Sequence, residues 1–324
     1  MTETSPTPGP RARKPERGAT LRDVAGAAGV SIATASYAFN RIDRIAPPTR
    51  ERVLAAAREL GYAGPDPQAR ALRRGAVATV SVLGQEGTAE LWARPTAALF
   101  CQGVATACDR TGVALNLAGD VVQASGPTLA FRPRPDGELT SSRLITIDGE
   151  IHGYPSITAD IELAAHELAV HLWDLGHRRL AVIGWEGETE RATQVARAWR
   201  SRGPLVAVRP PGLARGDGEV AAVAALQEDP GITAIVAVAD ELALGAIDGV
   251  ARLGRSVPTD VSVAGIDDVP EARLRGLTTA FVPYEQMGQL ATTVLLSGSA
   301  VPPPFPAPLT IRSTTGRATP SASG

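Results

Sequence analysis

The sequence predicts two regions of different fold class: a small all-α domain with a helix-turn-helix near the N-terminus, followed by a larger α/β core. Residues 20–40 have the pattern of two short helices joined by a glycine-containing turn, which is the spacing of a helix-turn-helix. From residue 76 onward, short β-rich runs alternate with helical stretches, as in a parallel sheet covered by helices on both faces. Residues 64–75 contain prolines and glycines and indicate a linker between the two regions.

The helix-turn-helix prediction depends on capping residues and on apolar spacing. The Thr20 hydroxyl can cap the first helix, Gly29 ends that helix, and Ser31 can cap a second helix that runs to Phe39. Residues expected to face inward are Val24, Ala25, Ala28, Ala35 and Phe39. In a motif of this kind the second helix lies in the major groove of DNA, but an ordinary helical hairpin has the same spacing. The spacing alone leaves both interpretations open.

A third helix is predicted over residues 49–60, ending at Gly61. Its apolar face, Val53, Leu54, Ala57 and Leu60, is sufficient to close a three-helix domain over residues 19–63.

The α/β core is predicted from the alternation of short elements. The expected strands are 77–83, 113–118, 144–148, 180–184, 205–208, 232–238 and 261–266. The expected helices are 96–111, 160–176, 189–202, 218–228 and 241–254. In such folds a ligand binds beyond the carboxyl ends of the strands.

Composition and charge agree with a soluble protein of more than one domain. The chain has 324 residues, of which 44% are hydrophobic, enough to bury a substantial core. Residues 1–75 carry 13 arginines and lysines against 7 acidic residues, whereas the remainder carries 19 against 27. A basic N-terminal region followed by an acidic body is typical of a protein whose N-terminal region binds the phosphates of nucleic acid.

The cysteines, the termini and the hydropathy indicate a cytoplasmic protein without a membrane span. Cys101 and Cys108 lie seven residues apart on an expected helix, about 10 Å between Cα atoms and too far for a disulfide. No apolar run of 18 residues occurs, and the N-terminus has no secretory signal. Residues 1–18 and 313–324 are expected to be disordered tails.

The residues of the helical domain identify a family. The pattern T-L-x-D-V-A-x-x-A-G-V-S-x-x-T-x-S-x-x-F-N over residues 20–40 closely resembles the headpiece of the LacI/GalR family of bacterial transcription regulators. Segments 171–184, 239–254, 257–268 and 277–288 resemble the effector-binding core of the same family, which is like a periplasmic sugar-binding protein with two Rossmann-like subdomains. Residues 118–143 are too few for the usual strand and helix, so we expect a shortened first subdomain that lacks a strand or distorts one.

The resemblance implies a set of DNA-binding residues. These are Thr20, Leu21, Ser31, Ile32, Ala33, Thr34, Ser36, Tyr37, Asn40 and Leu72. Ile32, Ala33 and Tyr37 are expected to reach base edges, while the hydroxyl and amide side chains are expected to contact phosphates. The same hydroxyls are also suited to helix capping. Leu72, in an A-R-A-L segment that matches the family's hinge helix (within 64–75), is expected to enter the minor groove as a wedge.

The resemblance also implies an effector pocket in the core, residues 76–312. Its expected residues are Arg191 and Asp240, which can hold vicinal hydroxyls through charge-assisted hydrogen bonds. Trp185 follows a strand and is expected either to stack on a ligand or to fill the cleft, and Trp92 is a weaker candidate.

The sequence gives no indication of a catalytic or metal site. His166 and His171 superficially resemble HExxH, but they are five residues apart, so one helix cannot direct both at one zinc ion. No G-x-S-x-G, P-loop or G-x-G-x-x-G motif occurs, and no cofactor is expected.

The sequence-based hypothesis is a homodimeric, ligand-responsive repressor that binds a pseudo-palindromic operator in double-stranded DNA and takes a carbohydrate-like effector. The alternative hypotheses are a solute-binding protein without a DNA role, an α/β enzyme, and a family member that no longer senses a ligand because its core is shortened.

Overall fold

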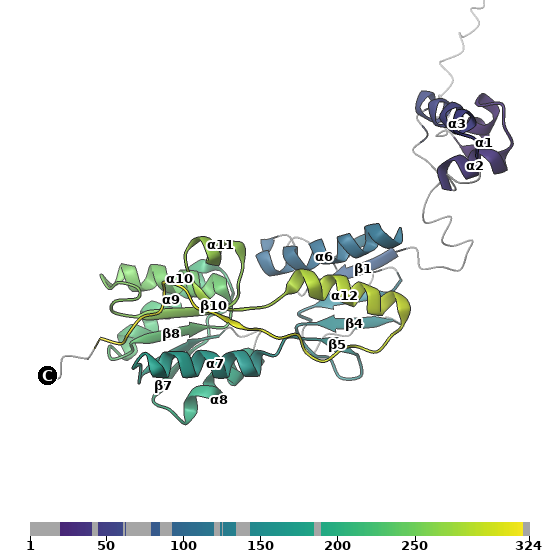
Figure 1. Ribbon diagram of the computed structural model, residues 1–324. Coiled ribbons are helices and arrows are strands. Elements are labelled where there is room, and N and C mark those ends of the chain that lie inside the picture. Colours follow the sequence, from purple (N-terminus) through teal and green to yellow (C-terminus); the bar gives the residue numbers. More distant parts are fainter. Residues whose placement is uncertain are drawn as a thin grey trace, which may run out of the picture. The chain divides into compact units, whose positions relative to one another are not determined.

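The computed structural model describes residues 20–40, 45–60, 62, 79–84, 93–119, 124, 126–133, 143–184 and 189–319. The chain divides into two compact units, Met1–Ala76 and Val77–Gly324. We call them the headpiece and the core (Figure 1).

The headpiece consists of three short helices, α1 (Leu21–Ala27), α2 (Ile32–Asn40) and α3 (Pro47–Glu59). Thr20 and Asp23 form a capping box at the start of α1: the Thr20 backbone N–H donates to Asp23 Oδ2 at 2.8 Å, and the Asp23 N–H donates to Thr20 Oγ1 at 3.4 Å. Gly29, with φ 62°, makes the turn into α2. The predicted helix-turn-helix and its two caps are therefore present.

The headpiece core is made of small apolar side chains. Its buried members are Val24, Ala25, Ala28, Ala35, Ala38, Val53, Ala56 and Ala57. Leu60, predicted to face this core, is instead 41% exposed. It is the C-cap residue of α3 and lies one position beyond the helix.

The first lobe of the core is a five-stranded parallel sheet with strand order β2-β1-β3-β4-β5. The strands are β1 (Thr79–Leu83), β2 (Ala114–Ala118), β3 (Thr128–Phe131), β4 (Leu144–Ile147) and β5 (Ser156–Ile157). Helices α6 (Pro95–Thr111) and α12 (Tyr284–Ser297) belong to this lobe. Its buried cysteines, Cys101 and Cys108, are free thiols.

The expectation that this lobe lacks or distorts a strand was wrong. β3 is present, pairs in regular parallel register with both β1 and β4, and is buried along its whole length. Only residues 119–127 connect β2 to β3, and their described members form no helix. The shortening therefore falls on the connection, because the strand itself completes the ladder between two neighbours.

The second lobe is a six-stranded sheet with strand order β11-β10-β9-β8-β6-β7. Its strands are β6 (Leu180–Ile183), β7 (Leu205–Val208), β8 (Ala234–Ala237), β9 (Ser262–Asp267), β10 (Thr278–Phe281) and β11 (Leu309–Thr310). Its helices are α7 (Ile161–Asp174), α8 (Thr189–Arg200), α9 (Arg215–Glu228), α10 (Asp240–Arg252) and α11 (Pro270–Leu274). All neighbouring strands are parallel except β10 and β11.

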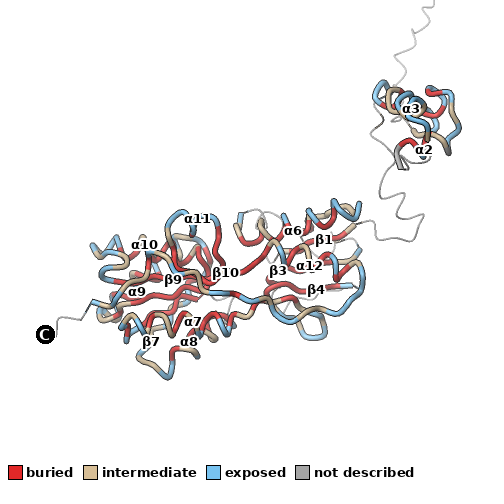
Figure 2. Tube along the Cα trace, in the orientation of Figure 1, coloured by how far each residue is buried: buried red, intermediate tan, exposed pale blue. Residues whose placement is uncertain are grey.

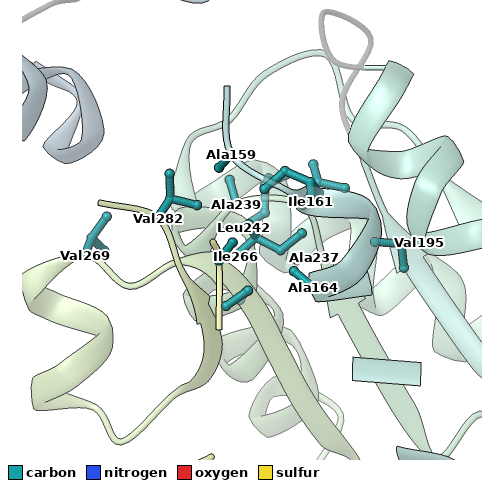
Figure 3. Packing of buried hydrophobic residues seen from close by; sticks show 14 of the residues in the cluster. Ala159, Ile161, Ala164, Val195, Ala237, Ala239, Leu242, Ile266, Val269 and Val282 are labelled. Carbon is teal, nitrogen blue, oxygen red and sulfur yellow. The ribbon is translucent and has the colours of Figure 1, made fainter. Parts of the chain in front are cut away.

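The chain passes between the lobes after β5, after β10 and after α12, so each lobe is built from segments far apart in the sequence (Figure 1). Two of the crossing segments touch at Ala159 and Phe305, which form a parallel bridge. Figure 2 shows the strands of both lobes largely buried, with exposed residues confined mainly to helix faces and loops. Figure 3 shows apolar side chains from α7, α8, β8, α10 and β9 packed together in the second lobe, near the crossing segment at Ala159.

The C-terminal segment corrects a second expectation. Residues 313–319, predicted to be part of a disordered tail, lie against the second lobe. The Val263 N–H donates to the Thr314 carbonyl at 2.8 Å, the Thr278 N–H donates to Thr314 Oγ1 at 2.9 Å, and the Ala318 N–H donates to the Leu175 carbonyl at 2.9 Å. A polar segment is ordered here because the Thr314 carbonyl and hydroxyl accept from N–H groups of β9 and β10, a pairing that composition does not reveal. Residues 320–324 lie outside the described part.

Among the described residues, no helix is both long enough and apolar enough to cross a membrane.

Candidate functional site

The headpiece presents two large apolar side chains on the surface of α2. Ile32 is 45% exposed and Tyr37 is 44% exposed, whereas Ala35 and Ala38 of the same helix are buried in the headpiece core. Thr34 is half-buried, and its backbone N–H donates to Ser31 Oγ at 3.0 Å, so Ser31 caps α2. Leu21 packs at the edge of the headpiece core.

Several predicted site residues cannot be placed. Ala33, Ser36 and Asn40 belong to α2 by their backbone, but their side chains lie outside the described part, as do Leu72, Trp92 and Trp185 altogether.

The core holds a cluster of five polar side chains where its two lobes meet, which we call the interlobe cluster. It consists of Arg132, Asp148 and Tyr284 from the first lobe and Arg191 and Asp267 from the second. Arg132 and Asp148 directly follow β3 and β4, Asp267 ends β9, Tyr284 opens α12, and Arg191 lies in the first turn of α8. The carboxyl ends of three parallel strands therefore supply three of the five residues, at the edge where α/β folds bind ligands.

Two carboxylates each accept from both arginines. Asp148 Oδ2 lies 2.7 Å from Arg132 Nε and 2.6 Å from Arg191 Nη2. Asp267 Oδ1 lies 3.1 Å from Arg132 Nη2 and 2.8 Å from Arg191 Nη1. The Tyr284 hydroxyl lies within hydrogen-bond distance of all four charged groups. Two positive and two negative charges thus balance in one network.

Burial and charge pairing shift the pKa values of groups in the network. All five residues are between 1% and 8% exposed. Burial alone would raise the pKa of Asp148, but the charges of Arg191 and Arg132 outweigh it and hold that pKa at about 2. Burial raises the pKa of the Tyr284 hydroxyl well above its ordinary value, so the phenol stays protonated and can donate one hydrogen bond.

The backbone at the cluster adopts unusual conformations. The backbone φ angle is 44° at Arg132, 54° at Asp148 and 131° at Asp267. Residues other than glycine rarely adopt positive φ values of this kind. Such conformations persist only where the surrounding structure fixes them, and they concentrate at functional sites. Here each one turns a charged side chain into the space between the lobes.

Of the predicted effector residues, Arg191 lies in the interlobe cluster and Asp240 does not. Asp240 is fully buried at the start of α10, where it accepts from Thr279 Oγ1 at 2.6 Å and from the Val269 N–H at 2.9 Å. Both partners belong to the second lobe. Burial, followed by the nearby charge of Asp267, raises the pKa of Asp240 well above its ordinary value. Asp240 therefore connects α10 to β10 and to the start of α11 by hydrogen bonds within the second lobe.

Sequence reasoning missed Arg132, Asp148, Asp267 and Tyr284. Asp148 and Asp267 lie at the carboxyl ends of predicted strands. Because ligands of α/β folds bind at these ends, this position could have marked both residues as candidates for the site. Arg132 carried no such signal, because β3 was not predicted. Tyr284 lies within the family-like segment 277–288, but its role depends on the crossing between lobes.

No group of three or more potential metal ligands occurs in the part of the chain that the structure describes. His166 is exposed on α7, whereas His171 is half-buried with its Nε2 2.9 Å from Thr315 Oγ1.

Comparison with known proteins agrees with this two-part architecture. The model described as "Bacterial regulatory proteins, lacI family" matches residues 20–64, and that described as "Periplasmic binding protein-like domain" matches residues 169–315. An HTH-type transcriptional regulator of Mycobacterium tuberculosis is 33% identical over 328 residues, covering 87% of this chain and 91% of the relative.

Among solved structures, the Lac repressor dimer bound to operator and the anti-inducer ONPF has a TM-score of 0.75 at 23% identity, covering 93% of this chain and all of that one. The complex of the transcriptional regulator CelR with cellobiose has a TM-score of 0.64 at 24% identity, covering 91% and 99%. A helix-turn-helix headpiece joined to a two-lobed binding-protein core defines a DNA-binding transcriptional regulator. The chain belongs to the lacI family of bacterial regulatory proteins.

Proposed function

We propose that this regulator is a homodimeric repressor that binds a pseudo-palindromic operator through two headpieces. The observation that carries the DNA-binding part is the surface of α2, where Ile32 and Tyr37 are exposed while Ala35 and Ala38 of the same helix are buried in the headpiece core. Apolar and aromatic side chains on a recognition helix can contact thymine methyl groups and base edges. The remaining predicted DNA contacts, Leu72 included, belong to this proposal, and dimer symmetry accounts for the palindrome.

We further propose that the interlobe cleft is the regulatory site of the core. The supporting observation is the buried, charge-balanced cluster at the carboxyl ends of β3, β4 and β9. A ligand that prefers one degree of lobe closure shifts the closure equilibrium by its differential affinity and can thereby alter operator binding. Arg191 is the effector contact that this geometry favours, with Asp240 and Trp185 as further candidates. A carbohydrate-like effector is proposed by analogy with the transcriptional regulator CelR, whose solved structure is a complex with cellobiose.

The DNA-binding proposal is tested by gel-shift titration against DNA from upstream of the protein's own gene. Wild type, Tyr37→Ala, Leu72→Ala and Leu163→Ala are compared at two salt concentrations. Leu163 is half exposed on α7 in the core and serves as the matched control for removal of an exposed apolar side chain. We expect tight binding to one palindromic site, weakened tenfold or more by the headpiece and hinge changes and unaltered by Leu163→Ala. Equal weak binding to every duplex by all four proteins would refute the proposal.

The effector is sought by a thermal-shift screen over sugars and sugar phosphates, because a ligand that binds only the folded state raises Tm by mass action. A hit that raises Tm in wild type but not in Arg191→Ala would support the cleft as the site. Intact operator binding without any hit would favour the second candidate function, a regulator that does not sense a ligand. In the interlobe cluster each charged group already pairs with a group of the chain itself, and this observation favours that alternative, although the buried Asp267 Oδ2 is left without a hydrogen-bond partner.

A further inference from the structure

Four hydrogen bonds of the interlobe cluster join one lobe to the other. Arg132 Nη2 donates to Asp267 Oδ1 at 3.1 Å, and Arg191 Nη2 donates to Asp148 Oδ2 at 2.6 Å. The Tyr284 hydroxyl lies 2.6 Å from Asp267 Oδ1 and 2.9 Å from Arg191 Nη2. Hydrogen bonds between ionised groups shielded from water are the stronger ones in proteins.

Arg132 occupies a cage formed by anionic and aromatic groups. Its guanidinium carbon lies 5.7 Å from the ring centroids of both Phe131 and Tyr284, while Asp148 and Asp267 accept its hydrogen bonds. A cation close to aromatic rings and held between two carboxylates is the arrangement in which proteins bind free cations. Here the cation belongs to the chain itself, and its side chain is only 5% exposed.

The charges of the groups around Arg132 explain why contact between the two lobes depends on this residue. Without Arg132, Asp148 and Asp267 would face each other with Arg191 as their shared cation, and Glu241 would add to the imbalance. Glu241 lies close enough for the charge of Asp267 to contribute, after burial, to raising its pKa, while Arg132 opposes that shift. A buried carboxylate that loses its partner is costly, and opening the cleft to water is the direct way to relieve that cost.

We propose that Arg132 is a built-in occupant of the regulatory site, which holds the two lobes closed in the absence of any small molecule. This rests on the proposed function in one respect only, that the cleft is the regulatory site. The occupant is covalently tethered and thus present at high effective concentration. A diffusing ligand must displace the Arg132 side chain. The apparent affinity of the ligand is therefore its intrinsic affinity multiplied by the fraction of molecules in which Arg132 is out of the site.

Chemical rescue tests the proposal. Arg132→Ala removes the guanidinium with its ethylene stem, and ethylguanidinium supplies the same group from solution. The control variant is Arg179→Ala, which removes an arginine from a surface ion pair with Asp229. The readouts are hydrogen exchange in the crossing segment 158–160 and at the Val282 N–H, which donates to the Asp267 carbonyl at 3.2 Å, and the Tm of the full-length protein during ethylguanidinium titration. An ethylammonium titration controls for charge without guanidinium geometry.

We expect about tenfold or faster exchange in the crossing segments of Arg132→Ala, since lost lobe contacts lower the free energy of local opening. Ethylguanidinium should slow this exchange and raise the Tm of the variant along a saturable curve. It should have no such effect on wild type or Arg179→Ala, and ethylammonium should be a poor substitute. The proposal would be overturned if the crossing segments of Arg132→Ala exchanged at the wild-type rate. It would also be overturned if no concentration of ethylguanidinium slowed the exchange of the variant.

If Arg132→Ala does not fold, Arg132→Gln replaces it with a neutral side chain that still fills space. Faster exchange at the crossing segments would then support the proposal, and wild-type exchange would overturn it. Neither readout uses DNA. A protein that fails to bind an operator but passes the rescue test would refute the DNA-binding part of the proposed function and leave standing the role of Arg132 in holding the lobes closed.

Discussion

Gly265 lies in β9 directly against Asp240, so closely that a Cβ atom added to Gly265 would overlap the carboxylate oxygen Oδ1. The same Cβ would stand 3.1 Å from Leu277 Cδ2 and 3.2 Å from the Ala243 Cβ. Both oxygens of Asp240 already hold hydrogen bonds, so the side chain has no free direction in which to move.

We therefore predict that Gly265→Ala destabilises the core by about 1–3 kcal/mol through overpacking. Gly216→Ala is the matched control, because an added Cβ there meets nothing within 4 Å. Gly216 lies in α9, where alanine is the better helix former, so the control should be neutral or slightly stabilising. Urea denaturation of both variants provides the comparison, and equal midpoints would contradict the prediction.

Asp240→Asn tests the buried carboxylate itself. An amide can keep the bond from the Val269 N–H and donate to the Thr279 hydroxyl, so the fold should survive. Because the pKa of Asp240 is raised in the folded state, the unfolded chain releases its proton first as pH rises above 3.8. Wild type should therefore lose stability relative to Asp240→Asn with rising pH. Melting curves from about pH 4.5 to 7.5 measure the difference; parallel profiles would argue against a raised pKa.

The crossing of α6 and α12 depends on two glycines. An added Cβ on Gly288 would overlap the Phe100 carbonyl, and one on Gly103 would overlap the Glu285 carbonyl. Backbone atoms cannot turn aside, so Gly288→Ala must push the two helices apart. Tyr284 precedes Gly288 by one helical turn, and we predict that its hydroxyl moves away from Asp148 and Asp267.

The expected result for Gly288→Ala is a loss of about 1–3 kcal/mol or more in unfolding free energy, accompanied by faster hydrogen exchange of the Val282 N–H in the crossing segment before α12. Gly216→Ala again serves as the control. Lost stability without any change in that segment would mean that α12 shifts without disturbing the interlobe cluster.

His177 should make the core sensitive to acid. It is buried, its Nε2 lies 3.0 Å from the Gly316 carbonyl, and its Nδ1 lies 2.9 Å from Thr233 Oγ1. Since a carbonyl only accepts, Nε2 carries the proton and Nδ1 accepts from Thr233 in the neutral ring. Burial lowers the pKa of His177 below 6.5, and the nearby His171 and Arg178 lower it further, although the bond to Gly316 opposes the shift.

The unfolded chain therefore takes up this proton before the folded chain does, and stability falls as pH drops below 6.5. One such group gives a slope of at most about 1.4 kcal/mol per pH unit. We predict a shallower slope for His177→Gln in urea denaturation at a series of pH values. His171→Gln is the comparison variant, because the pKa of His171 is also lowered by burial. Identical slopes for wild type and His177→Gln would show that another group causes the acid sensitivity.

The sequence by itself determined those features that are encoded by a few residues adjacent in the chain. The Thr20 and Ser31 caps, the turn at Gly29 and the helical spacing of Val24 and Ala28 act within one or two turns, so the headpiece could be predicted from its own letters. The alternation of strands and helices in the core is equally local. Arg191 was found because it belongs to a recognisable segment of the lacI family.

Only the tertiary structure decided which residues meet between the lobes. Arg132 contacts Asp267 across 135 positions and Tyr284 across 152, and no local pattern encodes such a pairing. β3 and the segment 313–319 were missed because each is stabilised by backbone hydrogen bonds to strands distant in sequence. The physical reason is the same in every case: burial and charge pairing depend on which surfaces the folded chain brings together, whereas helix and strand signals depend on adjacent residues.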